Sequence, residues 1–380
     1  MRGRYPHVES RCVHFHQPVF KARYPGTIAV RRAADGSFSL LVTLPFEQYL
    51  EGIEEMPPSW PMEALEAQAI AARSYALAST GWSGAQGEKL KTPICSTSSC
   101  QVYGGMPIGA VGDRRRWYRA VRRTTGQVLV FDGRPADTVH FLTSNGHTYG
   151  NDQVFGSAPL PYLRPVAERN DGASPVSHWS VSIRYADLAT FLSTGGEWPA
   201  GTPIGRVRLR GGDVLVTGAG TSRTIDLSTF REDVDTWAPC LKPGRYPPDG
   251  LPTTIPSSWL SMSGGRRAVT VTGRGWGHGV GMVQWGAYGK ARLGWSADRI
   301  LAYYYGGLAP QTFPEPGLIH VQVASGLDSI RLVPSTAGAR IDGTRVGRGP
   351  IVFGRGELVR SPSPRSSPTP SPTPAPSASS

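Results

Sequence analysis

The chain has 380 residues, long enough for one large domain or two of ordinary size, and 39% of them are hydrophobic. Its 40 lysines and arginines outnumber its 28 acidic residues, so the formal net charge is +12 and polyanionic surroundings are expected. The sequence contains no zinc-finger, RNA-binding aromatic or basic-zipper motif, which excludes the usual nucleic-acid-binding classes. No apolar run is long enough to predict a transmembrane helix, and the first residues lack the apolar stretch of a signal peptide.

The first predicted elements are a hairpin and two helices. Residues 27–44 alternate apolar and polar side chains on either side of Asp35-Gly36, which predicts a β-hairpin. Residues 45–53 place their apolar side chains on one face, which predicts an amphipathic helix. A second helix, capped by Ser59, is expected to continue to about Ser79.

The later elements are mostly short strands. Residues 203–231 repeat the strand pattern, with Gly211-Gly212 at a turn, and further helices are expected over 185–192 and 283–292. Strands and a few helices follow one another without a regular βαβ rhythm. The sequence therefore predicts a mixed, β-rich α+β fold.

The predicted domain organisation has four parts. They are an N-terminal β segment over 1–39, a main domain with a substrate groove over 40–310, a small β unit over 311–360, and a tail over 361–380. The tail is rich in Pro, Ser and Thr, and such a segment cannot bury enough apolar surface to order itself. It is interpreted either as a wall-spanning spacer or site of sugar attachment, or as a frayed end.

The chain has four cysteines, of which Cys95 and Cys100 are close together in ICSTSSC. In an exported protein this spacing favours a short-loop disulfide. Cys12 and Cys240 would close a long loop, although connectivity cannot be set by sequence alone. A zinc site needs three or four ligands, and no histidine lies between Cys95 and Cys100, so neither a metal nor another cofactor is expected.

One acid stands beside an apolar corner. Glu55 precedes Met56-Pro57-Pro58, and Trp60 follows closely. These neighbours would desolvate the carboxyl group and raise its pKa, as a general acid near neutral pH requires. The alternative is an ordinary surface acid, as is expected of Glu47, Glu51 and Glu54 on the exposed side of the first helix.

The second helix carries an arginine among small residues. Arg73 is surrounded by Ala71, Ala72 and Ala76, so its side chain is expected to be buried, and a buried guanidinium must be paired. Two interpretations remain open. Either Arg73 forms a structural ion pair with Glu66, or it orients a catalytic carboxylate or a substrate oxygen.

Two glycine-containing segments have the composition of binding loops. Residues 273–289 alternate glycine with Arg274, Trp276 and His278, which predicts a strand with one bare face that a ligand or another backbone can approach. Aromatic side chains here would stack on sugar rings, and the simpler alternative is a packed core strand with a satisfied histidine. Residues 140–150 offer small hydroxyl groups, but a Ser144, His147 and Asp152 triad lacks the G-x-S-x-G elbow.

Several of these segments together resemble one family. They are EMP and QAIAARSYAL within 44–77, CQVYGG at 100–105, TTGQVLVFDG at 124–133, SNGHT at 144–148, PYL at 161–163, GRGWGHGVGMVQWGAYG at 273–289 and ILAYYYGG at 300–307. In this order they resemble the SpoIID/LytB family of bacterial cell-wall proteins. The resemblance covers about residues 40–310.

The resemblance implies an extracytoplasmic lytic transglycosylase that cleaves peptidoglycan glycan strands, preferentially without stem peptides, in sporulation or wall remodelling. The glutamate before Met-Pro, Glu55, would be catalytic and Arg73 would be the family's functional arginine. The residues expected to bind substrate are Trp276, His278, Gln284, Ser144 and Thr148. The alternative is a non-catalytic, glycan-binding enhancer whose partner is a cell-wall amidase.

Two departures from the family accompany this resemblance. Gly146-His147 stands where many relatives have Gly-Gly, which would alter the groove. Some relatives look able to bind zinc through cysteines and a histidine, whereas Ser99 precedes Cys100 here and that ligand set is not reproduced. The chemistry needs one carboxylate, because the muramoyl C6 hydroxyl attacks internally and Glu55 would act first as acid and then as base.

Overall fold

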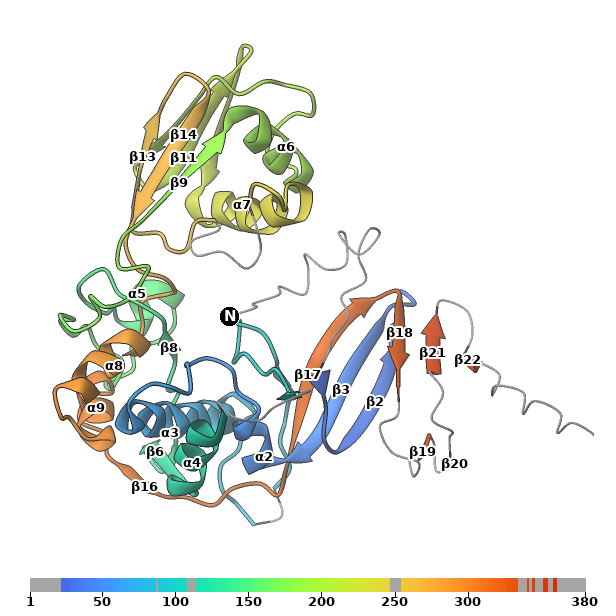
Figure 1. Ribbon diagram of the computed structural model, residues 1–380, viewed down its shortest axis with the longest axis vertical. Coiled ribbons are helices and arrows are strands. Elements are labelled where there is room, and N and C mark those ends of the chain that lie inside the picture. The colour runs from blue at the N-terminus through green and yellow to red at the C-terminus, as the bar shows by residue number, and fades with distance from the viewer. Residues whose placement is uncertain are drawn as a thin grey trace, which may run out of the picture. The chain divides into compact units, whose positions relative to one another are not determined.

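The computed structural model describes residues 22–86, 88–107, 114–246, 254–333, 340–341, 344–345, 351–354 and 358–360. The chain divides into two compact units, Met1–Val30 with Leu40–Ala324 and Arg31–Ser39 with Ser325–Ser380. Helices alternate with several small sheets (Figure 1), which confirms the predicted α+β class. Cys12 and the predicted tail over 361–380 lie outside the described residues.

The helices of the described residues are short except for α3 and α7. Their bounds are α2 Phe46–Glu51, α3 Met62–Ser79, α4 Arg115–Arg123, α5 Asn151–Phe155, α6 Tyr185–Gly195, α7 Leu227–Leu241, α8 Gln284–Arg292 and α9 Ala297–Tyr304. Within these residues, no helix combines the length and the apolar composition that crossing a membrane requires.

The strands form small sheets. Their bounds are β1 Ala22–Arg23, β2 Thr27–Arg32, β3 Phe38–Pro45, β4 Ile94–Cys95, β5 Met106–Pro107, β6 Gln127–Phe131, β7 Arg134–Pro135, β8 His140–Phe141, β9 Trp179–Arg184, β10 Arg206–Arg210, β11 Asp213–Gly218, β12 Thr221–Asp226, β13 Leu260–Gly264, β14 Ala268–Gly273, β15 Met282–Val283, β16 Pro310–Thr312, β17 Leu318–Leu327, β18 Ser329–Leu332, β19 Arg340–Ile341, β20 Thr344–Arg345, β21 Ile351–Gly354 and β22 Leu358–Arg360. The largest sheet has the order β2-β3-β17-β4, and β8 pairs with β15 in parallel.

Helix α3 is buried on all sides. Its alanines let other elements approach closely, and it packs against α4, β6, α8 and α9. A helix that is apolar all round belongs inside a protein, which is the reason for its weak amphipathic pattern. The predicted cap at Ser59 is wrong, because the chain turns through Pro57–Trp60 and the helix begins after Pro61, whose carbonyl accepts the N–H groups of Ala64 and Leu65.

Helix α2 ends before the predicted residue 53. Gly52 caps it, and the chain then runs beside the segment that follows the Cys95–Cys100 disulfide, whose Cα atoms are 5.6 Å apart. The N–H of Glu54 donates to the carbonyl of Val102 at 2.9 Å, and Ile53 pairs with Tyr103. This short antiparallel pairing fixes the backbone immediately before Glu55.

Residues 179–273 build a hydrophobic core of their own. Strands β9, β13 and β14 form one sheet and β10–β12 another, with helices α6 and α7 packed together. Gly211 and Gly212 have φ angles of 61° and 96° between the paired residues Arg210 and Asp213, which is the tight turn that the sequence predicts. The strand prediction is wrong from Leu227 on, because Asp226 accepts the N–H groups of Ser228 and Thr229 and starts α7.

A buried ion pair connects α8 to Glu168, and the hydroxyl of Tyr304 from α9 contacts both charged groups. The Nζ of Lys290 donates to both carboxylate oxygens of Glu168 at 3.0 and 2.8 Å and to the hydroxyl of Tyr304 at 3.0 Å. Lys290 is 1% exposed and Glu168 is 3% exposed, so each charge depends on the other. The pair therefore fixes α8, whose first residue, Gln284, faces the candidate site described below.

We predict that Lys290→Met destabilises the protein by about 3–5 kcal/mol, because it leaves the buried Glu168 carboxylate without its cation. The double variant Lys290→Met with Glu168→Gln removes both charges and should recover more than half of this loss. Urea titration of both variants gives the two free energies of unfolding. An equal loss in the single and the double variant would contradict the ion pair's role.

Candidate active site

Glu55 lies where four separate segments meet. Its Oε1 accepts the backbone N–H of Val102 at 2.9 Å. Its Oε2 accepts the amide Nε2 of Gln68 from α3 at 3.0 Å and, more weakly, that of Gln284 from α8 at 3.5 Å. The same oxygen contacts the imidazole Nε2 of His140 on β8. The Glu55 side chain is 10% exposed, so the carboxylate is enclosed by polar donors but still reaches the surface.

His140 is the closest partner of Glu55. Its Nδ1 lies 3.2 Å from the carbonyl oxygen of Thr138 and donates to it, which leaves Nε2 facing the carboxylate. Burial alone lowers the pKa of His140, but the charge and hydrogen bond of Glu55, the Thr138 carbonyl and Asp137 outweigh burial and raise it. No local sequence pattern marks His140 as a partner of Glu55, although it stands at the start of the segment 140–150.

His278 supports His140 and is not free to bind a ligand. Its Nε2 donates to the carbonyl oxygen of His140 at 3.0 Å, and its Nδ1 accepts the N–H of Val280 at 3.1 Å. Burial and the positive charge of His140 lower the pKa of His278 to about 4, so its ring is neutral at pH 7. Both ring nitrogens serve the protein itself, in place of the predicted substrate contact.

The glycines around His278 do not form the predicted strand. Gly275, Gly277, Gly279 and Gly281 all have positive φ angles, which a continuous strand does not allow. Close backbone approach is nevertheless their function, because a Cβ atom on Gly281 would lie 2.0 Å from the carbonyl oxygen of Val139. This loop brings the backbone against the strand that carries His140.

The predicted substrate residues Ser144 and Thr148 are internal. Ser144 is 4% exposed, and its hydroxyl donates to Asp171 Oδ2 at 2.8 Å. Thr148 is 1% exposed, and its hydroxyl accepts the N–H of Val166 at 2.9 Å. Asp152 contacts Arg164 at 3.3 Å, so the structure does not assemble a Ser144, His147 and Asp152 triad. These side chains hold the loop in shape, and their hydroxyl groups do not line an open surface.

The aromatic side chains near the site differ in exposure. Trp276 is partly buried and packs against the core of residues 179–273. Trp60 packs on Trp285, with ring centroids 4.7 Å apart. By contrast, Phe155 of α5 is 49% exposed and its ring centroid lies 5.3 Å from that of His278. An isolated Phe in a polar segment gave no signal in the sequence.

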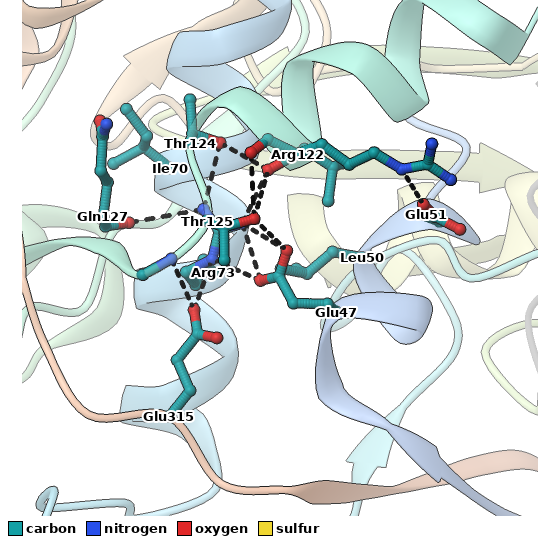
Figure 2. A network of polar contacts seen from close by, with 12 residues as sticks. Glu47, Leu50, Glu51, Ile70, Arg73, Arg122, Thr124, Thr125, Gln127 and Glu315 are labelled. Atoms are coloured by element: carbon teal, nitrogen blue, oxygen red, sulfur yellow. Dashed lines mark hydrogen bonds and ion pairs between the residues drawn. The ribbon is translucent and has the colours of Figure 1, made fainter.

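Arg73 belongs to a separate network (Figure 2). Its guanidinium is 0% exposed and contacts Glu47 at 2.8 Å and Glu315 at 2.8 Å. It also donates to the hydroxyl of Thr124 at 3.3 Å and to the carbonyl of Val121 at 3.2 Å. A fully buried side chain cannot touch a substrate. Arg73 therefore holds α2, α3, the end of α4 and the segment before β17 together.

Two sequence predictions about this network are corrected. Arg73 does not pair with Glu66, which contacts Arg123 at 3.1 Å instead, and its carboxylate partners are Glu47 and Glu315 in place of Glu55. Glu47 is not a solvated acid, because it balances the buried guanidinium. Glu54 is exposed, as expected of a surface acid, and it pairs with Arg114, while Glu51 pairs with Arg122.

Both sulfurs of Cys95 and Cys100 are used in their disulfide, and neither is therefore available as a thiolate ligand. Among the described residues, no group of three or more His, Cys, Asp and Glu side chains is arranged to hold a metal ion. The sulfurs act through the chain instead. They close the turn that leads to Val102, whose N–H holds Glu55.

Comparison with known proteins places this geometry in a family. The family model described as Stage II sporulation protein, SpoIID, matches residues 34–131, which include Glu55 and Arg73. The chain is 32% identical over 270 residues to an uncharacterized protein of Brachyspira hyodysenteriae, covering 70% of this chain and 66% of that protein. It is 27% identical over 297 residues to the Bacillus subtilis protein named Amidase enhancer, covering 68% of this chain and 39% of that protein.

A third relative is the Stage II sporulation protein D of Bacillus subtilis, 27% identical over 297 residues, which are 74% of this chain and 78% of that protein. The chain thus spans 66% of the Brachyspira protein and 39% of the Amidase enhancer. The names of the two Bacillus subtilis relatives refer to sporulation and to an amidase. The chain belongs to the SpoIID/LytB family.

The Arg73 network predicts a pH dependence of stability. Burial raises the pKa of Glu315 from 4.5 to about 7, since burial and the nearby Glu47 carboxylate outweigh the attraction of Arg73. The folded-state pKa is raised, so the stabilisation from this group is full below pH 4.5 and is lost as the pH rises through 7. Between pH 5 and pH 8, unfolding free energy should fall by on the order of 2 kcal/mol more in wild type than in Glu315→Gln. Urea titrations at each pH measure this difference. An equal change in unfolding free energy with pH in wild type and Glu315→Gln would contradict the raised pKa of Glu315.

Proposed function

We propose that this protein cleaves peptidoglycan glycan strands as a lytic transglycosylase, with Glu55 as its acid and base. The observation that carries the proposal is the setting of one carboxylate among Gln68, Gln284, His140 and the Val102 N–H. These contacts come from amides and an imidazole, not from a second carboxylate. A hydrolase normally needs a second carboxylate to activate water or to act as nucleophile, whereas an internal transglycosylase does not.

The reaction can be written with this single group. Protonated Glu55 donates to the glycosidic oxygen, the C1–O bond breaks with its electron pair going to that oxygen, and C1 gains oxocarbenium character. The C6 hydroxyl of the same muramoyl residue then attacks C1. Its proton passes to the Glu55 carboxylate, so the product has a 1,6-anhydro ring and the enzyme regains its proton.

The surrounding surface is compatible with a glycan. Phe155 presents half of its ring to solvent next to His278, which in turn contacts the backbone of His140. Aromatic faces stack on the apolar faces of sugars, so we assign Phe155 to a sugar-stacking role. The net charge of +12 suits an anionic cell wall outside the cytoplasm.

The second candidate function follows from the relative named Amidase enhancer. In that case the chain would bind glycan and stimulate a cell-wall amidase without cutting the strand itself. The enclosed carboxylate favours the enzyme, because a binding module has no need of an acid held by four donors. The two functions differ in whether loss of Glu55 abolishes a reaction.

We predict that purified wild type releases fragments ending in 1,6-anhydromuramic acid from peptide-stripped glycan strands, and that Glu55→Gln lowers the rate by about 100-fold or more. Mass spectrometry of the digests identifies the ends. The matched control is Glu54→Gln, which changes the neighbouring, more exposed acid and should retain activity.

Each other outcome would change the assignment. Reducing ends in place of anhydro ends would indicate hydrolysis with a second carboxylate. Binding without cleavage by either protein, together with stimulation of an amidase that persists in Glu55→Gln, would establish the enhancer function and exclude the transglycosylase. Parallel digests of intact peptidoglycan test whether stem peptides must be absent.

We also predict that Phe155→Ala raises KM for glycan strands by about 5–10-fold and leaves kcat and the unfolding midpoint nearly unchanged, since one exposed stacking contact is worth about 1 kcal/mol. The control is Val154→Ala on the same helix, which is 39% exposed and lacks a ring. Equal KM values in both variants would remove Phe155 from the binding surface.

A further inference from the structure

The backbone and amide groups that contact Glu55 in the described structure are all hydrogen-bond donors. Each of these groups contacts the carboxylate through an N–H, which can donate a hydrogen bond but cannot accept one. They are the backbone N–H of Val102 and the side-chain amides of Gln68 and Gln284. Hydrogen bonds to a carboxylate favour the charged state, and so does a neighbouring imidazolium. A general acid, however, must begin the reaction with a proton. The structure therefore requires a second group that holds this proton when Glu55 does not.

We propose that Glu55 and His140 share a single proton and work as one acid, with His140 as the positioning and proton-holding residue. The Nε2 of His140 contacts Oε2 of Glu55, and both side chains are nearly buried, at 5% and 10% exposure. The Nδ1 of His140 donates to the Thr138 carbonyl, so only Nε2 can exchange a proton with the carboxylate. The kinetic part of this inference rests on the proposed glycan cleavage, whereas the shared proton does not.

The position of Gln68 is consistent with a proton shared by Glu55 and His140, because its side-chain amide contacts both residues. Its Nε2 lies 3.0 Å from Oε2 of Glu55 and 2.9 Å from Nε2 of His140. The opposite amide orientation would place a carbonyl oxygen against the carboxylate, which is repulsive. In the described orientation the amide Oε1 is buried without a hydrogen-bond partner among the described residues. When Nε2 of His140 holds the proton, the Gln68 amide donates to Oε2 of Glu55 alone, and when the proton has left the pair it can also donate to Nε2 of His140.

The other ionisable groups around the pair do not supply the proton. His278 faces the backbone of His140 and is neutral, since burial and His140 lower its pKa to about 4. Burial raises the pKa values of Tyr49 on α2, Tyr75 on α3 and Tyr305 after α9, so these hydroxyls stay protonated. Asp137, three residues before His140 in the chain, acts on His140 through its charge, which contributes to the raised pKa of His140.

The proton balance follows from these contacts. At rest the proton lies on Nε2 of His140 and Glu55 is ionised. It moves to Oε2 of Glu55, which forms an O–H bond as the N–H bond breaks, and then to the glycosidic oxygen as the C1–O bond breaks. The C6 hydroxyl later returns one proton to Glu55, and the pair ends the turnover as it began, without any co-reactant.

The first test is a nitrogen-15 NMR titration of the histidine rings in the full chain, comparing wild type with Glu55→Gln. A shared proton requires that His140 titrate above an ordinary histidine in wild type and fall by about one pH unit or more when the carboxylate is removed. The exposed His147 serves as internal reference and should not move. An unshifted His140, or one that ignores Glu55→Gln, would overturn the inference whether or not the protein cuts glycan.

The second test is the pH profile of glycan cleavage by wild type, His140→Gln and the matched control His147→Gln. When the pair loses its only proton, activity ends, so the alkaline limb of kcat/KM reports the pair. It should move to lower pH by about one unit or more in His140→Gln and stay in place in the control. If His140→Gln lowers the rate equally at every pH and the alkaline limb does not move, His140 has only a structural role. Failure of wild type to cut would refute the proposed function, and the NMR titration would still decide the shared proton.

Discussion

The structure depends on the neutralisation of one buried cation. Arg73 sits in a helix that is enclosed on all sides, and a guanidinium there is stable only if carboxylates and carbonyls surround it. Glu47 comes from α2, Glu315 from the segment before β17, and Val121 from α4. The requirement to pair one charge thus fixes how these elements meet. Figure 2 shows Glu47, Glu315 and Thr124 around the guanidinium, which is 0% exposed.

The candidate active site inherits its geometry from the same helix. Gln68 precedes Arg73 on α3 and faces Glu55, while the carbonyl of Ala72 accepts the amide of Gln101 beside the Val102 N–H. A displacement of α3 would therefore move two of the contacts of Glu55 together. The family resemblance implies that Arg73 is functionally important. Arg73 can affect Glu55 without contacting it, because Arg73 fixes the position of α3 and α3 carries two of the contacts around Glu55.

The family comparison and the site geometry answer different questions. The matches establish the SpoIID/LytB family, and the relatives include both a sporulation protein and an amidase enhancer. The geometry is the basis of the proposed enzyme function, because an enclosed carboxylate beside an imidazole is suited to proton transfer. The buried hydroxyls of Ser144 and Thr148 show that matched segments can be structural as well as functional.

The sequence by itself determined the local features, which depend only on residues close together in the chain. The turns at Asp35-Gly36 and Gly211-Gly212, the helices on either side of Glu55 and the spacing of Cys95 and Cys100 follow from local backbone preference. Only the tertiary structure decided which side chains contact Glu55. His140 is 85 positions from Glu55, and Gln284 is 229 positions away. Such pairs form only when packed elements bring distant side chains together. A buried charged group needs hydrogen-bond partners that replace water, and no local sequence pattern specifies which residues these partners are.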